Sequence, residues 1–249
     1  MALADFAADL ALVAGGKNPS PRTAAIIVSA GNSSRMGGKI SKQFLTVGGK
    51  PVLAHTLLAF EKAKQIDEIV VVAKANAIEA VWLLAEQYGI TKLTQVTSGG
   101  STRALSVQRG FRKIDPKTKF VAIHDGARCL ITPDQIGKVC RMAYRHRAAT
   151  AATAVTDTVK QATRHGFIDK TLNRDRIFLV QTPQVFHADL YRAALANVKE
   201  EDLTDDNQLM EKINHVVKLV DFGKDNIKIT TPDDVPRAEF ILSQREEKA

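Results

Sequence analysis

Short, almost purely apolar segments alternate along the chain with longer segments whose apolar residues recur at helical spacing. Residues 24–28, 66–73, 93–96, 120–124 and 149–155 have the first pattern, which predicts buried β-strands. Residues 51–64, 78–88, 103–114 and 133–147 have the second pattern, which predicts amphipathic helices, the last opened by Thr132 as N-cap. Strand and helix therefore alternate from residue 24 to residue 155.

This alternation predicts how the strands are arranged. Near-continuous apolar strands joined by helices are typical of parallel strands with right-handed crossovers and helices on both faces. We therefore expect an α/β fold, a Rossmann-like, doubly wound, mostly parallel sheet. In such folds ligands bind beyond the carboxyl ends of the strands, so the loops after Val28, Val96 and Ile123 form the candidate site.

The alternation breaks at residues 157–176. Two polar, β-rich segments flank Arg164-His165-Gly166, which predicts a protruding β-hairpin arm. Beyond the arm we expect helices at 188–196, 205–213 and 232–245, and strands at 216–220 and 227–230. Because neither a repeat nor a long linker divides the chain, we expect a flexible N-terminal leader over residues 1–22 and a single domain over residues 23–249.

Composition adds one unusual feature, a formal net charge of +8 from 35 Lys+Arg and 27 Asp+Glu. Such an excess predicts an anionic partner, which is a nucleic acid, a membrane surface or a phosphorylated small molecule. The two cysteines, Cys129 and Cys140, lack the spacing of zinc ligands or of a disulfide framework. Because no apolar run of about 18 residues and no signal peptide occurs, we expect a cytoplasmic protein with no membrane partner.

The loop after the first strand has the parts of a phosphate site. Residues 30–43 contain Gly31 and the cations Arg35, Lys39 and Lys42. Glycine lets a ligand approach the backbone N–H groups, and the cations neutralise phosphate charge. The spacing matches neither a Walker A loop nor GxGxxG, so we expect a polyphosphate bound in another way.

Two further strand-end loops contribute to the same edge of the predicted sheet. Gly99 and Gly100 precede a helix that Ser101 can cap and whose N-terminal dipole favours anions. Asp125 follows the fourth strand, where a carboxylate beside phosphates can hold Mg²⁺. An ion pair between Asp125 and Arg128 that only orders the loop is the alternative, and His124 is expected to be a packed strand-end residue.

Seven short motifs carrying these residues stand in order along the chain. They are Ala30-Gly31 with Arg35-Met36 and Lys42-Gln43-Phe44, Gly99-Gly100-Ser101-Thr102-Arg103 with Ser106-Val107, His124-Asp125-Gly126-Ala127-Arg128, Asp157-Thr158-Val159-Lys160, Gln181-Thr182-Pro183-Gln184-Val185-Phe186, Thr204-Asp205-Asp206 and Asp225-Asn226-Ile227-Lys228-Ile229-Thr230. Together, over about residues 23 to 243, they resemble the 2-C-methyl-D-erythritol 4-phosphate cytidylyltransferase family of the non-mevalonate isoprenoid pathway.

The resemblance implies a fold of the nucleotidyltransferase type and a reaction that joins CTP to 2-C-methyl-D-erythritol 4-phosphate. The products are 4-diphosphocytidyl-2-C-methyl-D-erythritol and pyrophosphate, with Mg²⁺ as cofactor. It implies catalytic roles for Arg35, Lys42, Arg174 and Lys228. It implies that Ala30, Gly31, Gly99, Gly100, Ser106, Asp125 and Ala127 bind the nucleotide. It also implies that Thr158, Arg174, Thr182 and Lys228 bind the sugar phosphate, partly across a homodimer joined through the arm, and that Asp125 and Asp225 hold the metal.

Three other functions compete with this interpretation. Ribitol 5-phosphate cytidylyltransferase shares the nucleotide motifs and differs in the acceptor pocket, although residues 157–160 and 204–206 favour the methylerythritol enzyme. A nicotinamide dehydrogenase is disfavoured because GxGxxG is missing. A nucleic-acid-binding protein could use a basic helix face at Arg141, Arg145, His146 and Arg147. No helix-turn-helix, RRM or OB pattern accompanies that face, so we expect no nucleic-acid partner.

Overall fold

The computed structural model describes residues 20–31, 41–196 and 203–247. Its strands are β1 Thr23–Val28, β2 Thr46–Val47, β3 Lys50–Pro51, β4 Glu68–Ala73, β5 Leu93–Ser98, β6 Phe120–Asp125, β7 Ala148–Ala154, β8 Lys160–Ala162, β9 Ile168–Thr171, β10 Phe178–His187 and β11 Lys218–Asp221. Its helices are α2 Val52–Lys62, α3 Ile78–Gln87, α4 Arg103–Phe111, α5 Pro133–His146, α6 Ala188–Ala196, α7 Asn207–Lys212 and α8 Asp234–Glu246, with single 3-10 turns η2 Lys42–Phe44, η3 Ala75–Ala77 and η4 Arg174–Arg176. Residues 1–19 of the expected leader lie outside the described residues.

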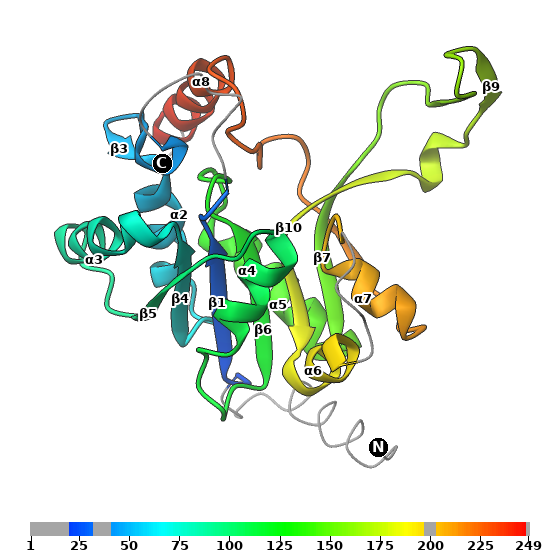
Figure 1. Ribbon diagram of the computed structural model, residues 1–249. Helices are drawn as coiled ribbons and strands as arrows, with labels where there is room; N and C mark the ends of the chain where they lie inside the picture. The colour runs from blue at the N-terminus through cyan, green and yellow to red at the C-terminus, as the bar shows by residue number, and fades with distance from the viewer. Residues whose placement is uncertain (1–19, 32–40, 197–202, 248–249) are drawn as a thin grey trace.

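A seven-stranded sheet in the order β11-β7-β10-β6-β1-β4-β5 runs through the molecule (Figure 1). β1 pairs in parallel with β4 and β6, β4 with β5, and β7 with β11. β10 alone is antiparallel to its neighbours β6 and β7. The sheet is therefore mostly parallel, as the alternating pattern predicts.

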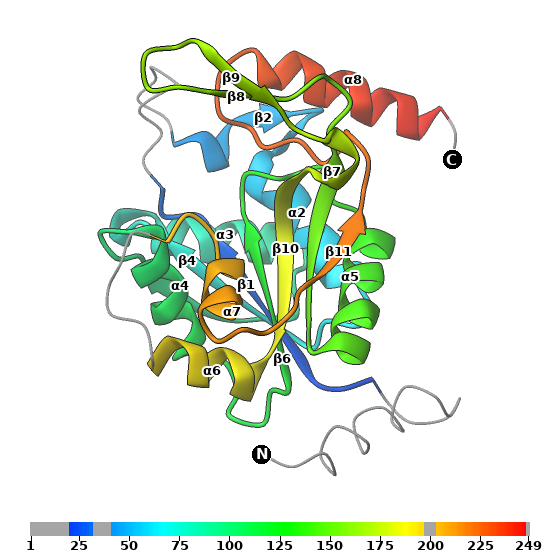
Figure 2. The ribbon, with the colours of Figure 1, turned by 90° about the vertical axis from the view of Figure 1, so that its right-hand side faces the viewer.

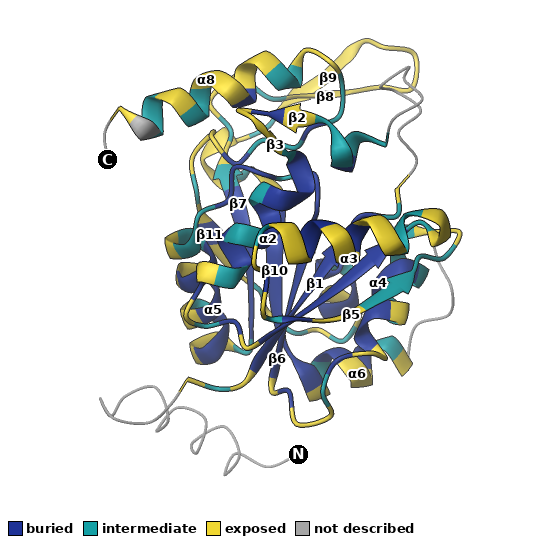
Figure 3. Cartoon of the chain, turned by 90° about the vertical axis from the view of Figure 1, so that its left-hand side faces the viewer, coloured by how far each residue is buried: buried dark blue, intermediate teal, exposed yellow. Residues whose placement is uncertain are grey.

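Helices cover both faces of the sheet (Figure 2). On one face Ala25 and Ile27 of β1 are buried in a cluster with α2, α3 and α5. On the other face Ala24 and Ile26 are buried in a cluster with α4, α6 and α7. Successive residues of β1 are buried on opposite faces, which explains why this strand is an uninterrupted apolar run. Figure 3 shows the central strands as the most completely buried part of the chain.

Strand β10 was missed because Pro183 stands in its middle, and proline argues against a central strand. The pairing of β10 with β7 shifts register between Val180 and Gln184, so Thr182 and Pro183 fall inside an irregularity. The ladder to β6 begins only at Gln184. Pro183 therefore removes no ladder hydrogen bond, and the irregular segment places Thr182 beside the end of β6.

The strand expected at residues 227–230 is wrong. Ile229 donates one backbone hydrogen bond of 2.8 Å to the carbonyl of Ala127, and no strand is assigned there. The Ile229 side chain is buried with Val47, Leu130 and Ala238 in a small third cluster under α8. Burial of one side of an irregular segment produces the same alternation as a strand, which explains the error.

The predicted arm is present as the antiparallel pair β8 and β9, which projects from the sheet (Figure 1). Every residue of the two strands is exposed. Phe167 and Ile168, at the tip, are 73% and 68% exposed. Elsewhere the expected strand at 216–220 and helix at 205–213 begin two residues late, at Lys218 and Asn207. Among the described residues no helix is long and apolar enough to cross a membrane.

Candidate functional site

A cavity of about 360 Å³ lies at the carboxyl edge of the sheet, where the ends of β1, β5 and β6 meet. Of the residues predicted from the sequence, those that line it are Ala30, Gly31, Lys42, Gly100, Ser106, Asp125, Ala127 and Lys228. Larger hollows of about 480 and 520 Å³ lie against α4 and α6 and against α3, away from this edge. The topology therefore brings together loops that are separated by almost 200 positions.

Asp125, the last residue of β6, is the electrostatic centre of the cavity. Its carboxylate lies 2.7 Å from Lys228 Nζ, 3.6 Å from Arg103 Nε and 3.8 Å from Arg128 Nε. Burial alone would raise the pKa of Asp125, but the charges of Lys228, Arg103 and Arg128 outweigh burial and hold the pKa well below its usual range. Asp125 is therefore ionised at neutral pH and holds three cations at the edge of the cavity.

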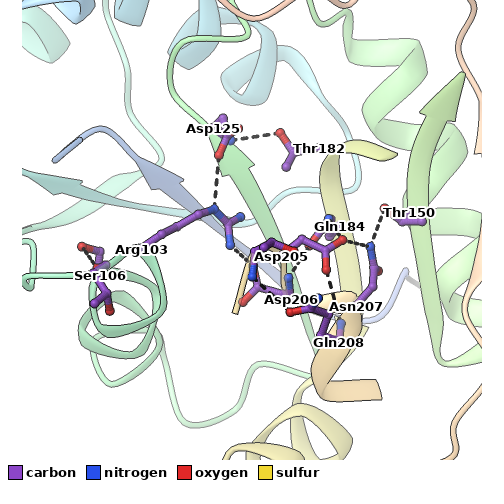
Figure 4. A network of polar contacts seen from close by, with 12 residues as sticks. Arg103, Ser106, Asp125, Thr150, Thr182, Gln184, Asp205, Asp206, Asn207 and Gln208 are labelled. Atoms are coloured by element: carbon purple, nitrogen blue, oxygen red, sulfur yellow. Dashed lines mark hydrogen bonds and ion pairs between the residues drawn. The ribbon is translucent and has the colours of Figure 1, made fainter. Parts of the chain in front are cut away.

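Arg103, the first residue of α4, is fixed from the side opposite Asp125 (Figure 4). Its Nη1 donates to Asp206 Oδ2 at 2.5 Å, and Asp206 Oδ1 accepts a 2.7 Å hydrogen bond from the Tyr191 hydroxyl. The backbone N–H of Asp206 donates to Gln184 Oε1 at 3.0 Å. Burial lowers the pKa of Arg103, but Asp206 and Asp125 raise it further, so the guanidinium stays charged.

The two glycines after β5 permit close contact between strand-end loops. A Cβ on Gly99 would lie 2.3 Å from Ala30 Cβ, and one on Gly100 would lie 2.5 Å from Leu105 Cβ. The Gly100 N–H donates to Ser106 Oγ at 3.0 Å, and Ser106 Oγ donates to the Thr102 carbonyl at 2.9 Å. Ser106 therefore shapes the loop that faces the cavity.

The cap of α4 differs from the expected one. The Thr102 side chain accepts from Leu105 N–H at 3.1 Å, so Thr102 is the N-cap and not Ser101. Ser101 lines the cavity instead. The expected Thr132 cap of α5 is confirmed, because Thr132 and Gln135 form a capping box.

Thr182 and His124 lie beneath Asp125. Thr182 is buried, and its hydroxyl accepts a 3.0 Å hydrogen bond from the Asp125 backbone N–H. His124 is a packed strand-end residue, as expected, with no exposed surface and its ring 5.0 Å from that of Phe60. Burial lowers the pKa of His124 to about 3, more than the attraction of Asp125 raises it. The imidazole is therefore neutral at physiological pH.

Some predicted residues do not line the cavity. Thr158 and Arg174 are exposed at the base of the arm, where Arg174 Nη1 donates to the Thr156 carbonyl at 2.7 Å. Asp225 is exposed, and Gly99 lies behind Ala30. Arg35 lies outside the described residues.

The donor set of the cavity fits a metal ion that is held largely by phosphate. Asp125 is the one acidic side chain that lines it among the described residues, and that part of the chain has no cluster of three or more His, Cys, Asp or Glu. Mg²⁺ is commonly bound by one or two carboxylates together with substrate phosphates. The ion pair between Asp125 and Arg128, expected as the alternative, is present, although Lys228 lies closer to the carboxylate.

The sequence assigned no binding or catalytic role to Tyr191, Gln184 or Asn226, and it placed Arg103 only among the basic residues of the strand-end loops. Arg103, Gln184 and Asn226 stand inside the quoted motifs, so the motifs were the available signal. Tyr191 stands in none of them, on an ordinary amphipathic helix. Only the packing of α6 against α7 and β10 shows that its hydroxyl reaches Asp206.

Comparison with known proteins agrees with this geometry. The family model described as 2-C-methyl-D-erythritol 4-phosphate cytidylyltransferase matches residues 23–244. The chain is 40% identical over 228 residues to the 2-C-methyl-D-erythritol 4-phosphate cytidylyltransferase of Pelotomaculum thermopropionicum, covering 90% of this chain and 96% of that protein. It is 40% identical over 223 residues to the enzyme of that name from Dehalococcoides mccartyi, covering 90% and 97%.

Solved structures give the same result. The crystal structure of 4-diphosphocytidyl-2C-methyl-D-erythritol synthase from Anaerococcus prevotii matches with a TM-score of 0.80 and 32% identity, covering 90% of this chain and 96% of that one. The 2-C-methyl-D-erythritol 4-phosphate cytidylyltransferase of Thermus thermophilus matches with a TM-score of 0.70 and 29% identity, covering 88% and 98%. The chain therefore belongs to the 2-C-methyl-D-erythritol 4-phosphate cytidylyltransferase family.

Proposed function

We propose that this protein transfers the cytidylyl group of CTP to 2-C-methyl-D-erythritol 4-phosphate, forming 4-diphosphocytidyl-2-C-methyl-D-erythritol and pyrophosphate. The observation that carries the proposal is the cationic cavity at the carboxyl edge of the sheet, in a chain that belongs to this family. Lys42, Lys228 and Arg103 line that cavity together with the backbone of two strand-end loops. Such a set suits a triphosphate and a second phosphate better than an uncharged ligand.

The reaction requires positioning and charge neutralisation. A phosphate oxygen of the acceptor attacks the α-phosphorus of CTP, the bond from that phosphorus to the bridging oxygen of the β-phosphate breaks, and pyrophosphate leaves. Both reactants are anionic, so cations that lower their repulsion stabilise the transition state. We assign this work to Lys42 and Lys228, with Arg35 and Arg174 as further catalytic residues.

The nucleotide is assigned to the loops after β1, β5 and β6. The residues concerned are Ala30, Gly31, Gly99, Gly100, Ser106, Asp125 and Ala127. The close contact of Gly99 with Ala30 and the hydrogen bond from Gly100 to Ser106 support a preformed loop for the base. Asp125 is the proposed ligand of Mg²⁺, which when bound would neutralise phosphate charge. Asp225, exposed and outside the cavity lining, is the weaker of the two ligands predicted from the sequence.

The acceptor is assigned to Lys228 and to Thr158 and Arg174 of the arm. Neither arm residue lines the cavity of its own chain. An exposed arm with Phe167 and Ile168 at its tip suits contact with a second copy. We infer a homodimer in which the arm of one chain brings Thr158 and Arg174 to the cavity of the other.

Pyrophosphate release tests the function directly. The wild-type protein with CTP and Mg²⁺ is assayed in parallel with 2-C-methyl-D-erythritol 4-phosphate and with ribitol 5-phosphate. We expect efficient release with the first acceptor only. Efficient release with ribitol 5-phosphate alone would assign the protein to the other acceptor, and no release with either would contradict a cytidylyltransferase.

A further inference from the structure

The Thr182 hydroxyl is buried below the cavity and hydrogen-bonded within the protein. It accepts from the Asp125 backbone N–H at 3.0 Å and lies 3.1 Å from His124 Nδ1. Thr182 is 4% exposed and is not among the residues that line the cavity. Its hydroxyl therefore acts on Asp125 and His124 from below.

The partners of the His124 ring fix the direction of this chain of hydrogen bonds. Nε2 lies 3.3 Å from the carbonyl oxygen of Arg128, which can only accept. Nε2 therefore carries the proton of the neutral ring, and Nδ1 accepts from the Thr182 hydroxyl. The hydroxyl therefore donates its single proton to His124 and accepts from the Asp125 backbone N–H, so it has no proton left to donate to a phosphate oxygen of the acceptor.

Asn226 closes the chain into a ring. Its side-chain amide is fully buried and donates to the Thr182 carbonyl at 3.0 Å and to Gln181 Oε1 at 2.8 Å. The backbone carbonyl of Asn226 accepts from Arg128 Nη1 at 2.8 Å. The ring therefore runs from Thr182 to His124, to Arg128, to Asn226 and back to Thr182, joining the end of β6, the irregular part of β10 and the C-terminal segment.

Two segments joined by these hydrogen bonds carry Asp125 and Lys228, which form the shortest ion pair between two described residues that line the cavity. Asp125 stands between His124 and Arg128 in sequence, and Lys228 follows Asn226 by two positions. Lys228 Nζ is 2.7 Å from Asp125 Oδ2. A displacement of either segment would separate these charges, because residues 227–230 form no strand and only one backbone–backbone hydrogen bond to the described residues, from Ile229 to Ala127, supports them there.

We propose that His124, Thr182 and Asn226 are positioning residues that hold Asp125 and Lys228 in register for catalysis, and that Thr182 does not itself bind the acceptor. The inference rests on the proposed function for its kinetic test. It assigns the effect of Thr182 to the reacting centre and not to acceptor affinity. Residues that hydrogen-bond to the ligands of a metal ion typically contribute about 10- to 100-fold to metal affinity or activity, and Asp125 is the proposed ligand here.

The test compares Thr182→Val, Thr182→Ser and Thr118→Val. Thr118 is a matched control, since it is 4% exposed and its hydroxyl has no hydrogen-bond partner. We expect Thr182→Val to lower kcat about 10- to 100-fold with an unchanged KM for the acceptor. Thr182→Ser keeps the hydroxyl and should keep kcat near the wild-type value. Thr118→Val should also match the wild type.

His124→Phe provides a second probe, because it keeps the contact with Phe60 and removes both ring hydrogen bonds. We expect the same lowered kcat, and the double variant with Thr182→Val should lose little more than either single variant, because the two residues act as one unit. A rise in acceptor KM with normal kcat in Thr182→Val would overturn the proposal. So would a kcat that falls equally in Thr118→Val, or independent losses that multiply in the double variant.

Nitrogen NMR of the folded wild-type protein tests the hydrogen-bonded ring of Thr182, His124, Arg128 and Asn226 independently of the proposed function. It should show His124 neutral with its proton on Nε2, and the Nδ1 signal should shift in Thr182→Val. A proton on Nδ1 of His124 would contradict the proposed direction of these hydrogen bonds, whichever acceptor the enzyme uses. Absence of turnover by the wild type would instead refute the proposed function.

Discussion

The floor of the cavity and the β8–β9 arm are built in opposite ways. Under Asp125, the side chains of His124, Thr182 and Asn226 are at most 4% exposed, and each is hydrogen-bonded to a neighbouring segment. In the arm every residue of both strands is exposed, and β8 and β9 pair only with each other. The same chain therefore contains a tightly connected region and one with almost no packing of its own.

The difference separates the two halves of the proposed site. Buried groups joined by several hydrogen bonds across three segments favour one arrangement, which suits the residues that must face a triphosphate. An isolated two-stranded hairpin is marginal in water without further packing. We therefore expect the nucleotide half to be preorganised in a single chain and the acceptor half to be completed by the arm of a second copy.

Loss of the cation beside Asp125 should have the largest effect on turnover. Lys228→Met keeps much of the side-chain stem and removes the charge 2.7 Å from Asp125. We expect kcat to fall about 10²- to 10³-fold, the scale for losing one preorganised group that stabilises developing charge. Steady-state pyrophosphate release measures it, with Lys218→Met, on the exposed edge of β11, as the control. Equal activities of the two variants would remove Lys228 from the reaction.

Loss of the cation in the arm should have a smaller and different effect. Arg174→Ala removes a guanidinium assigned to the acceptor phosphate, and a hydrogen bond to a charged group contributes about 1.5–3 kcal/mol. We expect kcat/KM for the acceptor to fall about 10- to 100-fold, with KM for CTP nearly unchanged. Arg176→Ala, in the same exposed turn η4, is the control. A rise in KM for CTP in Arg174→Ala would place the residue in the nucleotide half.

Weakening the hydrogen bonds that hold Arg103 should have a smaller effect, and among the kinetic constants only KM for CTP should change. Tyr191→Phe removes the 2.7 Å hydrogen bond to Asp206 and so loosens the partner of Arg103. We expect KM for CTP to rise about 5-fold and the free energy of unfolding to fall by about 1–2 kcal/mol. Kinetics and urea denaturation measure the two effects. An unchanged KM for CTP with lowered stability would reduce Tyr191 to a purely structural residue.

The smallest kinetic effect is expected from the cap of α5. Thr132→Ala removes the capping box without touching the cavity or the arm. The free energy of unfolding should fall by about 1 kcal/mol, while kcat and both KM values stay as in the wild type. A kinetic change here would show that the cavity floor depends on packing far from it.

Much of the fold could be predicted because burial gives strands and helices distinct patterns of apolar residues in the sequence. The run Ala24 to Val28 is apolar throughout because the strand is covered on both faces. Strand β10 could not be predicted, because the irregularity that accommodates Pro183 depends on the neighbouring strand. A strand was wrongly predicted at residues 227–230, since burial of Ile229 on one side of an irregular segment produces the alternating pattern of a strand.

The site was predictable only in part. Asp125 was predicted from its place at the end of a strand and Lys228 from its motif, but their contact joins positions 103 residues apart and depends on the tertiary fold. The pairing of Arg103 with Asp206 has the same character. Thr182 was expected to meet the acceptor, whereas its burial and partners became visible only once β10 was placed beside β6.

Mixing two defective variants tests most directly the claim that one chain supplies the floor and another supplies the arm. Lys228→Met and Arg174→Ala proteins are purified separately, mixed under conditions that exchange subunits, and assayed for pyrophosphate release. In a twofold dimer each mixed pair contains one site with neither substitution, so activity should recover to roughly a quarter of the wild-type value. Activity that stays at the average of the two separate variants, despite demonstrated exchange, would contradict the account.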